Sequence, residues 1–103
     1  MTDGVRDNPA ESRYEIVADE TLAGFASYHL HGDVADFTHT EIADEFEGRG
    51  LGSSLIRGAL DDARRRGLHV LPYCPFVREF IAKHDEYVDL VPGEQRPTFG
   101  LAS

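Results

Sequence analysis

The first half of the chain alternates between apolar and polar residues, a period of two that is typical of β-strands with one buried face. The alternation covers residues 13–17, 22–30 and 34–42. Asp19-Glu20 closes the first segment, and the residues around Gly32 form a turn between the second and the third. The pattern therefore predicts three strands joined as an antiparallel meander.

The second half of the chain changes mainly to the period of α-helices. Apolar residues recur at helical spacing over residues 51–66, which predicts the longest helix, and Gly67 is its expected end. The short apolar run 69–73 predicts a buried strand parallel to the third one, because a helix crosses over between them. A proline begins a second predicted helix over 75–84, and residues 87–91 have the composition of an optional last strand.

Together these elements predict an α+β fold. Its sheet is mixed and mostly antiparallel, with two principal helices in the order β-β-β-α-β-α and the optional final strand. A chain of 103 residues that is 41% hydrophobic forms one domain. We expect this domain to cover residues 13–91, between a loose N-terminus at 1–12 and a tail at 92–103 whose structure the sequence leaves open.

Length and composition also exclude several classes of protein. No apolar run approaches the roughly 20 residues that cross a membrane, and residues 1–7 lack the parts of a secretion signal. We therefore expect a cytoplasmic protein with no membrane partner. The single cysteine, Cys74, excludes an internal disulfide and a cysteine zinc cage. No group of His, Cys, Asp or Glu has the spacing of a metal site, so no metal is expected.

The net charge of -9 is unevenly distributed along the chain. Residues 1–47 hold twelve acidic side chains against Arg6 and Arg13, whereas the later residues are nearly balanced. Such asymmetry speaks against nucleic acid as a partner and is compatible with a cationic one. An acidic surface that is simply solvated explains the same pattern.

A glycine-rich loop connects the third strand to the long helix. Gly48, Gly50 and Gly52 surround the helix start and offer no capping side chain, so its first backbone amides stay free. These amides and the helix dipole favour a diphosphate, and Arg49 adds a positive side chain. The loop lacks the lysine of a P-loop and the glycine spacing of a dinucleotide fingerprint, so a nicotinamide cofactor is not expected.

The strand, the glycines, the helix and the following motifs resemble a known family. The motifs are Phe37-Thr-His-Thr-Glu-Ile, Gly50-Leu-Gly, Pro72-Tyr-Cys-Pro-Phe and Lys83-His-Asp-Glu-Tyr. They are similar to the small members of the GCN5-related N-acetyltransferase (GNAT) family that carry a Cys-Pro motif. One departure is Glu47, which stands where the larger family usually has Gln or Arg. Its carboxylate repels a diphosphate unless it turns outward.

The resemblance implies a GNAT-like fold and an acetyl-CoA-dependent N-acetyltransferase that acts on an amine. Acetyl-CoA or CoA is then the expected cosubstrate. Its implied binding residues are Ile42, Glu47, Gly48, Arg49, Gly50, Leu51, Gly52, Ser53 and Phe76. Two other interpretations remain open: a non-catalytic acyl-CoA-binding or regulatory module, and a structural use of the glycines for packing the helix on the strand.

Cys74 is the first candidate for a catalytic role. Pro75 suits the first position of a helix, so Cys74 is expected at the helix cap, where the dipole favours a thiolate. A small buried residue at the end of a strand is the plainer interpretation. The family resemblance, in which a cysteine at this place is proposed to be catalytic, favours the first.

His39 and Glu41 are the other catalytic candidates. Two positions apart on a strand, they are expected on one face together with Phe37, while Thr38, Thr40 and Ile42 share the other. Either side chain could take a proton from an ammonium substrate. A solvent-facing polar pair on a half-exposed sheet is the alternative.

Overall fold

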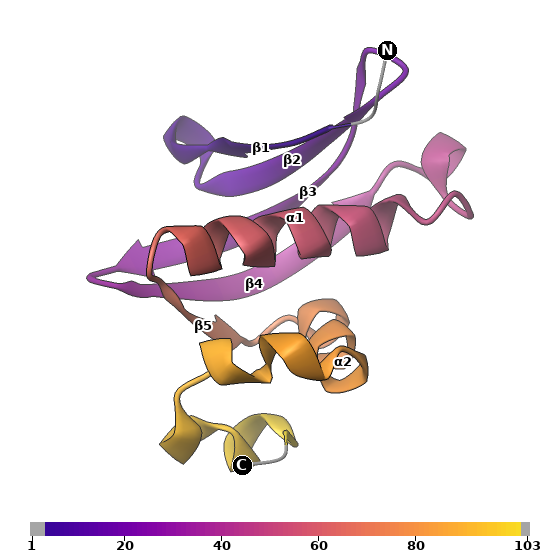
Figure 1. Cartoon of the computed structure of the whole chain (residues 1–103). Coiled ribbons are helices and arrows are strands. Elements are labelled where there is room, and N and C mark those ends of the chain that lie inside the picture. Colours follow the sequence, from indigo (N-terminus) through magenta and orange to yellow (C-terminus); the bar gives the residue numbers. More distant parts are fainter. Residues whose placement is uncertain (1–3, 102–103) are drawn as a thin grey trace.

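Within residues 4–101, which this computed structural model describes, five strands form one sheet in the order in which they occur along the chain (Figure 1). The strands are β1 (Gly4–Asn8), β2 (Arg13–Ala18), β3 (Thr21–His31), β4 (Val34–Ile42) and β5 (His69–Pro72). The first four pair antiparallel and β5 pairs parallel to β4. The predicted mixed, mostly antiparallel sheet is therefore confirmed.

Two helices cover this sheet unequally. Helix α1 (Leu51–Arg65) lies across one face of it, and α2 (Pro75–Lys83) lies beside β4 and β5 (Figure 1). The predicted apolar stripe of α1 is buried: Leu51, Leu55, Ile56, Ala59, Leu60 and Ala63. Gly50 and Gly67 flank the helix with φ of 75° and 72°, values that favour glycine. None of the helices within residues 4–101 is long and apolar enough to cross a membrane.

A β-bulge in β4 changes the predicted alternation of its side chains. Tyr28 pairs with Phe37 and Ser27 with His39, so Thr38 has no partner on β3. An extra residue of this kind reverses the alternation that follows it. The prediction that Phe37 shares a face with His39 and Glu41 is wrong, because Phe37 is buried whereas both later residues are exposed.

The predicted loose N-terminus is wrong for residues 4–8, which form β1 and pair with β2. The segment is too polar for the alternation to be visible, because two of its polar side chains bond to an acidic residue of β2. Arg6 and Asn8 on β1, together with Arg13 on β2, donate hydrogen bonds to the carboxylate of Glu15, which is 2% exposed. These three donors satisfy a charge that would otherwise be costly to bury.

The prediction of an optional last strand at 87–91 is also wrong. Residues Asp85–Leu90 form a 3-10 helix, whose Tyr87 and Leu90 are buried. Tyr87 donates a hydrogen bond of 2.6 Å to Asp61 on α1. The chain then continues as two short 3-10 turns, Gly93–Gln95 and Pro97–Phe99, and buries further apolar side chains at its end.

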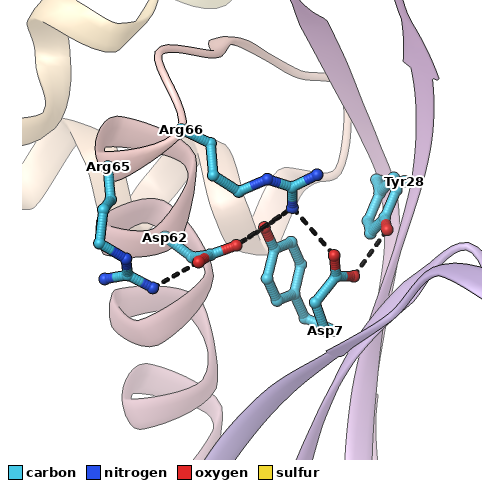
Figure 2. Close-up of polar contacts among 6 residues, drawn as sticks. Asp7, Tyr28, Asp62, Arg65 and Arg66 are labelled. Carbon is cyan, nitrogen blue, oxygen red and sulfur yellow. Dashed lines mark hydrogen bonds and ion pairs between the residues drawn. The ribbon is translucent and has the colours of Figure 1, made fainter.

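A polar cluster fastens the C-terminal end of α1 to the first three strands (Figure 2). The Arg66 guanidinium lies 2.9 Å from Asp7 on β1 and 3.2 Å from Asp62 on α1. Tyr28 donates a 2.6 Å hydrogen bond to Asp7, and Tyr14 donates one of 2.6 Å to Asp62. Burial, together with the bond to Asp7, raises the pKa of Tyr28 to about 12. Burial and the bond to Asp62 raise the pKa of Tyr14 further still.

Candidate functional site

A hollow of about 420 Å³ lies between the end of β4, the glycine loop and the N-terminal ends of both helices. Its lining residues are Ile42, Phe46, Glu47, Gly48, Gly50, Leu51, Gly52, Ser53 and Phe76. The fold thus gathers the predicted cofactor-binding residues around one space, with Arg49 as the exception. Phe46 is the addition that the sequence did not predict, because it lies between acidic residues in a segment with no clear period.

The start of α1 presents its backbone to this hollow. Gly48 and Gly50 have φ of 83° and 75°, and a Cβ atom on either would meet nothing within 4 Å. No side chain caps the helix, so the first amides of α1 have no capping acceptor among the described residues. The opening therefore combines free N-H donors, the positive end of a helix dipole and unobstructed access.

Gly52 brings the two helices together at the hollow. A Cβ atom on Gly52 would lie 2.7 Å from Cζ of Phe76, closer than side chains tolerate. The phenyl ring is 45% exposed and forms one wall of the hollow. The absence of a side chain at Gly52 therefore allows the ring to come this close, whereas the backbone angles of Gly52 do not call for a glycine.

Arg49 does not line the hollow. Its guanidinium lies 3.0 Å from the carboxylate of Asp19, in the turn between β2 and β3, and above the ring of Phe46 at 5.4 Å. The prediction that Arg49 adds a positive charge inside the site therefore fails for this arrangement of the loop. Asp19 holds that charge outside the hollow instead.

A second hollow of about 200 Å³ adjoins the first and shares Ser53 and Phe76 with it. Its other lining residues are Glu79, Phe80, Lys83 and His84. The His84 ring stacks on Phe80 with centroids 4.0 Å apart and bonds the Phe80 carbonyl oxygen at 2.7 Å. Lys83 is not among the predicted site residues, although its spacing from Phe76 along a helix places both on one side.

Cys74 lies where β4 and β5 separate. The pairing of these strands ends at Phe37 and Pro72, and the Cys74 amide then donates to the Phe37 carbonyl at 2.9 Å. From there β4 continues toward the hollow with a partner strand on the β3 side only, while the chain after Cys74 turns into α2. As predicted, Cys74 occupies the N-cap of α2, and it is 4% exposed.

His39 and Glu41 form a pair on the opposite face of β4. His39 Nε2 and Glu41 Oε1 are 3.1 Å apart, and the two side chains are 60% and 62% exposed. Phe25 on β3 lies between the His39 ring, at 6.1 Å, and the Arg13 guanidinium, at 4.6 Å. The structure therefore brings His39 and Glu41 together but does not bring them to the side of the strand that faces Cys74.

Comparison with known proteins agrees with this arrangement. The sequence model of the GCN5-related N-acetyl-transferases matches residues 13–90. The chain belongs to this family. A search of curated proteins finds no match.

Solved structures share the GNAT fold. The solution structure of a GCN5-like candidate N-acetyltransferase from Staphylococcus aureus is 25% identical, with a TM-score of 0.66 over 87% of this chain and 88% of that one. Ard1 from Thermoplasma volcanium is 21% identical, with a TM-score of 0.51 over 59% of this chain and 43% of that one. The similarity to Ard1 concerns the fold alone.

The charged groups around this GNAT site do not form a metal centre within residues 4–101. No group of three or more His, Cys, Asp or Glu side chains there has a suitable arrangement. The two hollows are lined by the backbone of the glycine loop, by aromatic rings, and by Lys83 and His84.

Proposed function

We propose that the protein is an acetyl-CoA-dependent N-acetyltransferase that acetylates an amine. The observation that carries the proposal is the hollow at the uncapped start of α1. It adjoins the end of β4, which has no neighbour on the β5 side, and it is built by the glycine loop of a GNAT domain. The volume, the free amides and the aromatic wall suit a ligand with both phosphate and apolar parts.

The diphosphate of CoA would be held by the amides at the start of α1. Gly48 and Gly50 permit close approach, since no side chain stands between a ligand and the backbone. Glu47 lines the same hollow and opposes an anion, so the amides must supply most of the attraction. This requirement explains why the helix carries no capping side chain at this end.

The second hollow would receive the nucleotide end of CoA. Lys83 offers an ammonium group to a phosphate, and the exposed ring of Phe76 and the stacked pair Phe80 and His84 offer flat surfaces to a base. Its shared border with the first hollow allows one ligand to span both.

The pantetheine arm of CoA would run along the free edge of β4. Between Thr38 and Ile42 this edge has no neighbouring strand on the β5 side, because the pairing stops at Phe37. Backbone groups of an open edge bind an extended ligand with amide groups, as an added strand would. Such a path leads from Ile42 in the hollow to Cys74.

When bound, acetyl-CoA supplies the acetyl group as a thioester. In the overall transfer the C-N bond of the product forms, the thioester C-S bond breaks, the amine loses one proton and the CoA sulfur gains one. Glu41 or His39 would accept the proton of an ammonium substrate. Cys74 would either take the acetyl group transiently or act as an acid or base.

A small hollow on the outer face supports an amine as the acceptor. It has about 130 Å³, and Leu22, Phe25 and Glu41 are among its lining residues. One carboxylate beside apolar walls suits a cation with an attached apolar group. The acids of the first half of the chain would attract such a cation.

One observation favours a second function, a non-catalytic acyl-CoA-binding module. Cys74 lies against one side of β4, whereas His39 and Glu41 lie on the other, so the candidate catalytic groups do not form one cluster. A protein that has kept the CoA site without turnover would show this arrangement as well.

An acetyl-transfer assay distinguishes the two functions. The protein is incubated with acetyl-CoA and separate acceptors: a peptide with a free α-amine, a lysine side chain, a polyamine, an aromatic amine and matched alcohols. Release of the CoA thiol and the mass of the acceptor are followed. An acetylated amine is expected. CoA binding without product from any amine supports the binding module, and acetylation of the alcohols alone contradicts the amine assignment.

A further inference from the structure

The bulge at Thr38 determines which residue of β4 faces Cys74. After the bulge Thr40 pairs with the fully buried Ala26, on the helix-covered side of the sheet. Its Oγ1 lies 3.4 Å from Cys74 Sγ, a normal distance for a hydrogen bond to sulfur. Without the bulge, the regular alternation would place Thr40 on the opposite side. The inserted residue therefore creates this contact.

The surroundings of Cys74 contain few other polar groups. Within residues 4–101, Thr40 is the one side chain in hydrogen-bond distance of the sulfur. The charged groups of β4 at this end, His39 and Glu41, point to the other face, and the first turn of α2 has no acidic side chain. The buried residues near the start of α1 are apolar, and on α2 the first charged residue is Arg78, one turn beyond Cys74.

The direction of this contact depends on the charge of the sulfur. A thiol and a hydroxyl can each donate to the other, but a thiolate has no proton and can only accept. A hydrogen bond to the charged form is stronger than one to the neutral form. The Thr40 hydroxyl therefore favours the thiolate, and the bond of the Cys74 amide to Phe37 fixes the backbone from which the sulfur projects.

We propose that Thr40 is a positioning residue that donates its hydroxyl hydrogen to the Cys74 sulfur, which orients the sulfur and favours its charged form over its neutral form. This role rests on the proposed function, because it serves a reactive cysteine beside the acetyl group. Thr40 does not react with substrate itself. It acts through Cys74, and neither the sequence motif nor the family assignment indicates it.

The test measures the rate of Cys74 alkylation by iodoacetamide as a function of pH, with intact mass as the readout. Two pairs of proteins differ only in the hydroxyl at similar side-chain size: the wild type against Thr40→Val, and Thr40→Ser against Thr40→Ala. Thr38→Val, a β-branched change at the exposed bulge, is the control. Circular dichroism establishes whether each variant folds. If Thr40→Val does not fold, the comparison of Thr40→Ser with Thr40→Ala tests the proposal.

In both pairs we expect loss of the hydroxyl to move the midpoint of the alkylation profile upward by about half to one pH unit, which lowers the rate near pH 7 about three- to tenfold. Thr38→Val should match the wild type. Unchanged profiles, a downward shift, or a thiol that does not react at any pH would overturn the proposal. An acetyl-transfer assay of the wild type is run separately, so a shifted profile without acetyl transfer refutes the proposed function and not the Thr40 contact.

Discussion

Gly52 at the start of α1 lies directly against the ring of Phe76 at the start of α2, where an added Cβ atom would come within 2.7 Å of Cζ. The contact is to the end of a half-exposed side chain, so the ring can move without disturbing the core. The cost of a larger residue therefore falls on the shape of the hollow and not on the fold.

From this contact we predict that Gly52→Ala separates stability from binding. Alanine stabilises a helix by up to about 1 kcal/mol over glycine, so the melting temperature should stay the same or rise. CoA affinity should fall about tenfold, or 1.4 kcal/mol, because the displaced ring reshapes the site. Thermal unfolding and calorimetry measure both quantities. Gly93→Ala, a glycine that also has a negative φ but lies away from the hollows, is the control.

A second prediction concerns the ion pair between Arg49 and Asp19. Asp19→Asn should raise CoA affinity up to about fivefold, because an exposed pair is worth at most about 1 kcal/mol and its loss frees the guanidinium for phosphate. Asparagine also tolerates the φ of 54° at this position. The gain should shrink in high salt. Glu20→Gln removes a neighbouring negative charge and serves as the control. An equal gain there would mean that general electrostatics, and not the release of Arg49, is responsible.

The second hollow predicts a role for Lys83 in recognising the nucleotide phosphate. Lys83→Met should weaken the binding of CoA by about 1.5 to 3 kcal/mol, the range of a hydrogen bond to a charged group, and leave the binding of 3′-dephospho-CoA almost unaffected. Competition binding with both ligands gives the two affinities. Arg78→Met, which removes a positive charge from the same helix outside the hollow, should not discriminate between them. Equal loss for both ligands would refute a phosphate contact.

The polar cluster at the end of α1 predicts a stability that depends on pH. The pKa of Tyr28 is about 12 in the folded protein and near 10 when unfolded, so the tyrosine stabilises the fold fully below pH 10 and loses this effect as pH rises toward 12. Tyr28→Phe should therefore lower the unfolding free energy by about 1.5 to 3 kcal/mol at pH 7, and this difference should narrow between pH 10 and 12.

Urea unfolding at several pH values measures this difference. Tyr73→Phe changes an exposed tyrosine outside the cluster and should be neutral throughout. A Tyr28→Phe difference that does not depend on pH would indicate lost packing instead of a lost hydrogen bond to Asp7.

The sequence predicts the fold and most of the hollow because these depend on local patterns. The buried stripe of α1, the glycines that flank it and the proline at the start of α2 each follow from spacing or backbone preference. Two features depend on partners that are distant in the sequence and were missed. Strand β1 is held through the buried Glu15, and Arg49 is drawn away by Asp19, thirty positions earlier.

The bulge at Thr38 explains the largest error within the site. A regular period of two is the only pattern available from the sequence, and one unpaired residue reverses it for the rest of β4. The prediction that His39 and Glu41 share a face is therefore confirmed, and the prediction that Phe37 shares this face with them is wrong. Thr40, to which no pattern in the sequence assigns a role, is the residue of β4 that contacts Cys74.

The central claim, that the start of α1 binds CoA, is tested most directly by calorimetric titration of CoA into three proteins. Gly50 and Gly67 lie at opposite ends of α1, with φ of 75° and 72° and no atom within 4 Å of an added Cβ, so valine strains both backbones similarly. The wild type and Gly67→Val should bind alike, and Gly50→Val at least about tenfold more weakly. Undiminished affinity in a folded Gly50→Val protein, or no binding by the wild type, would contradict the account.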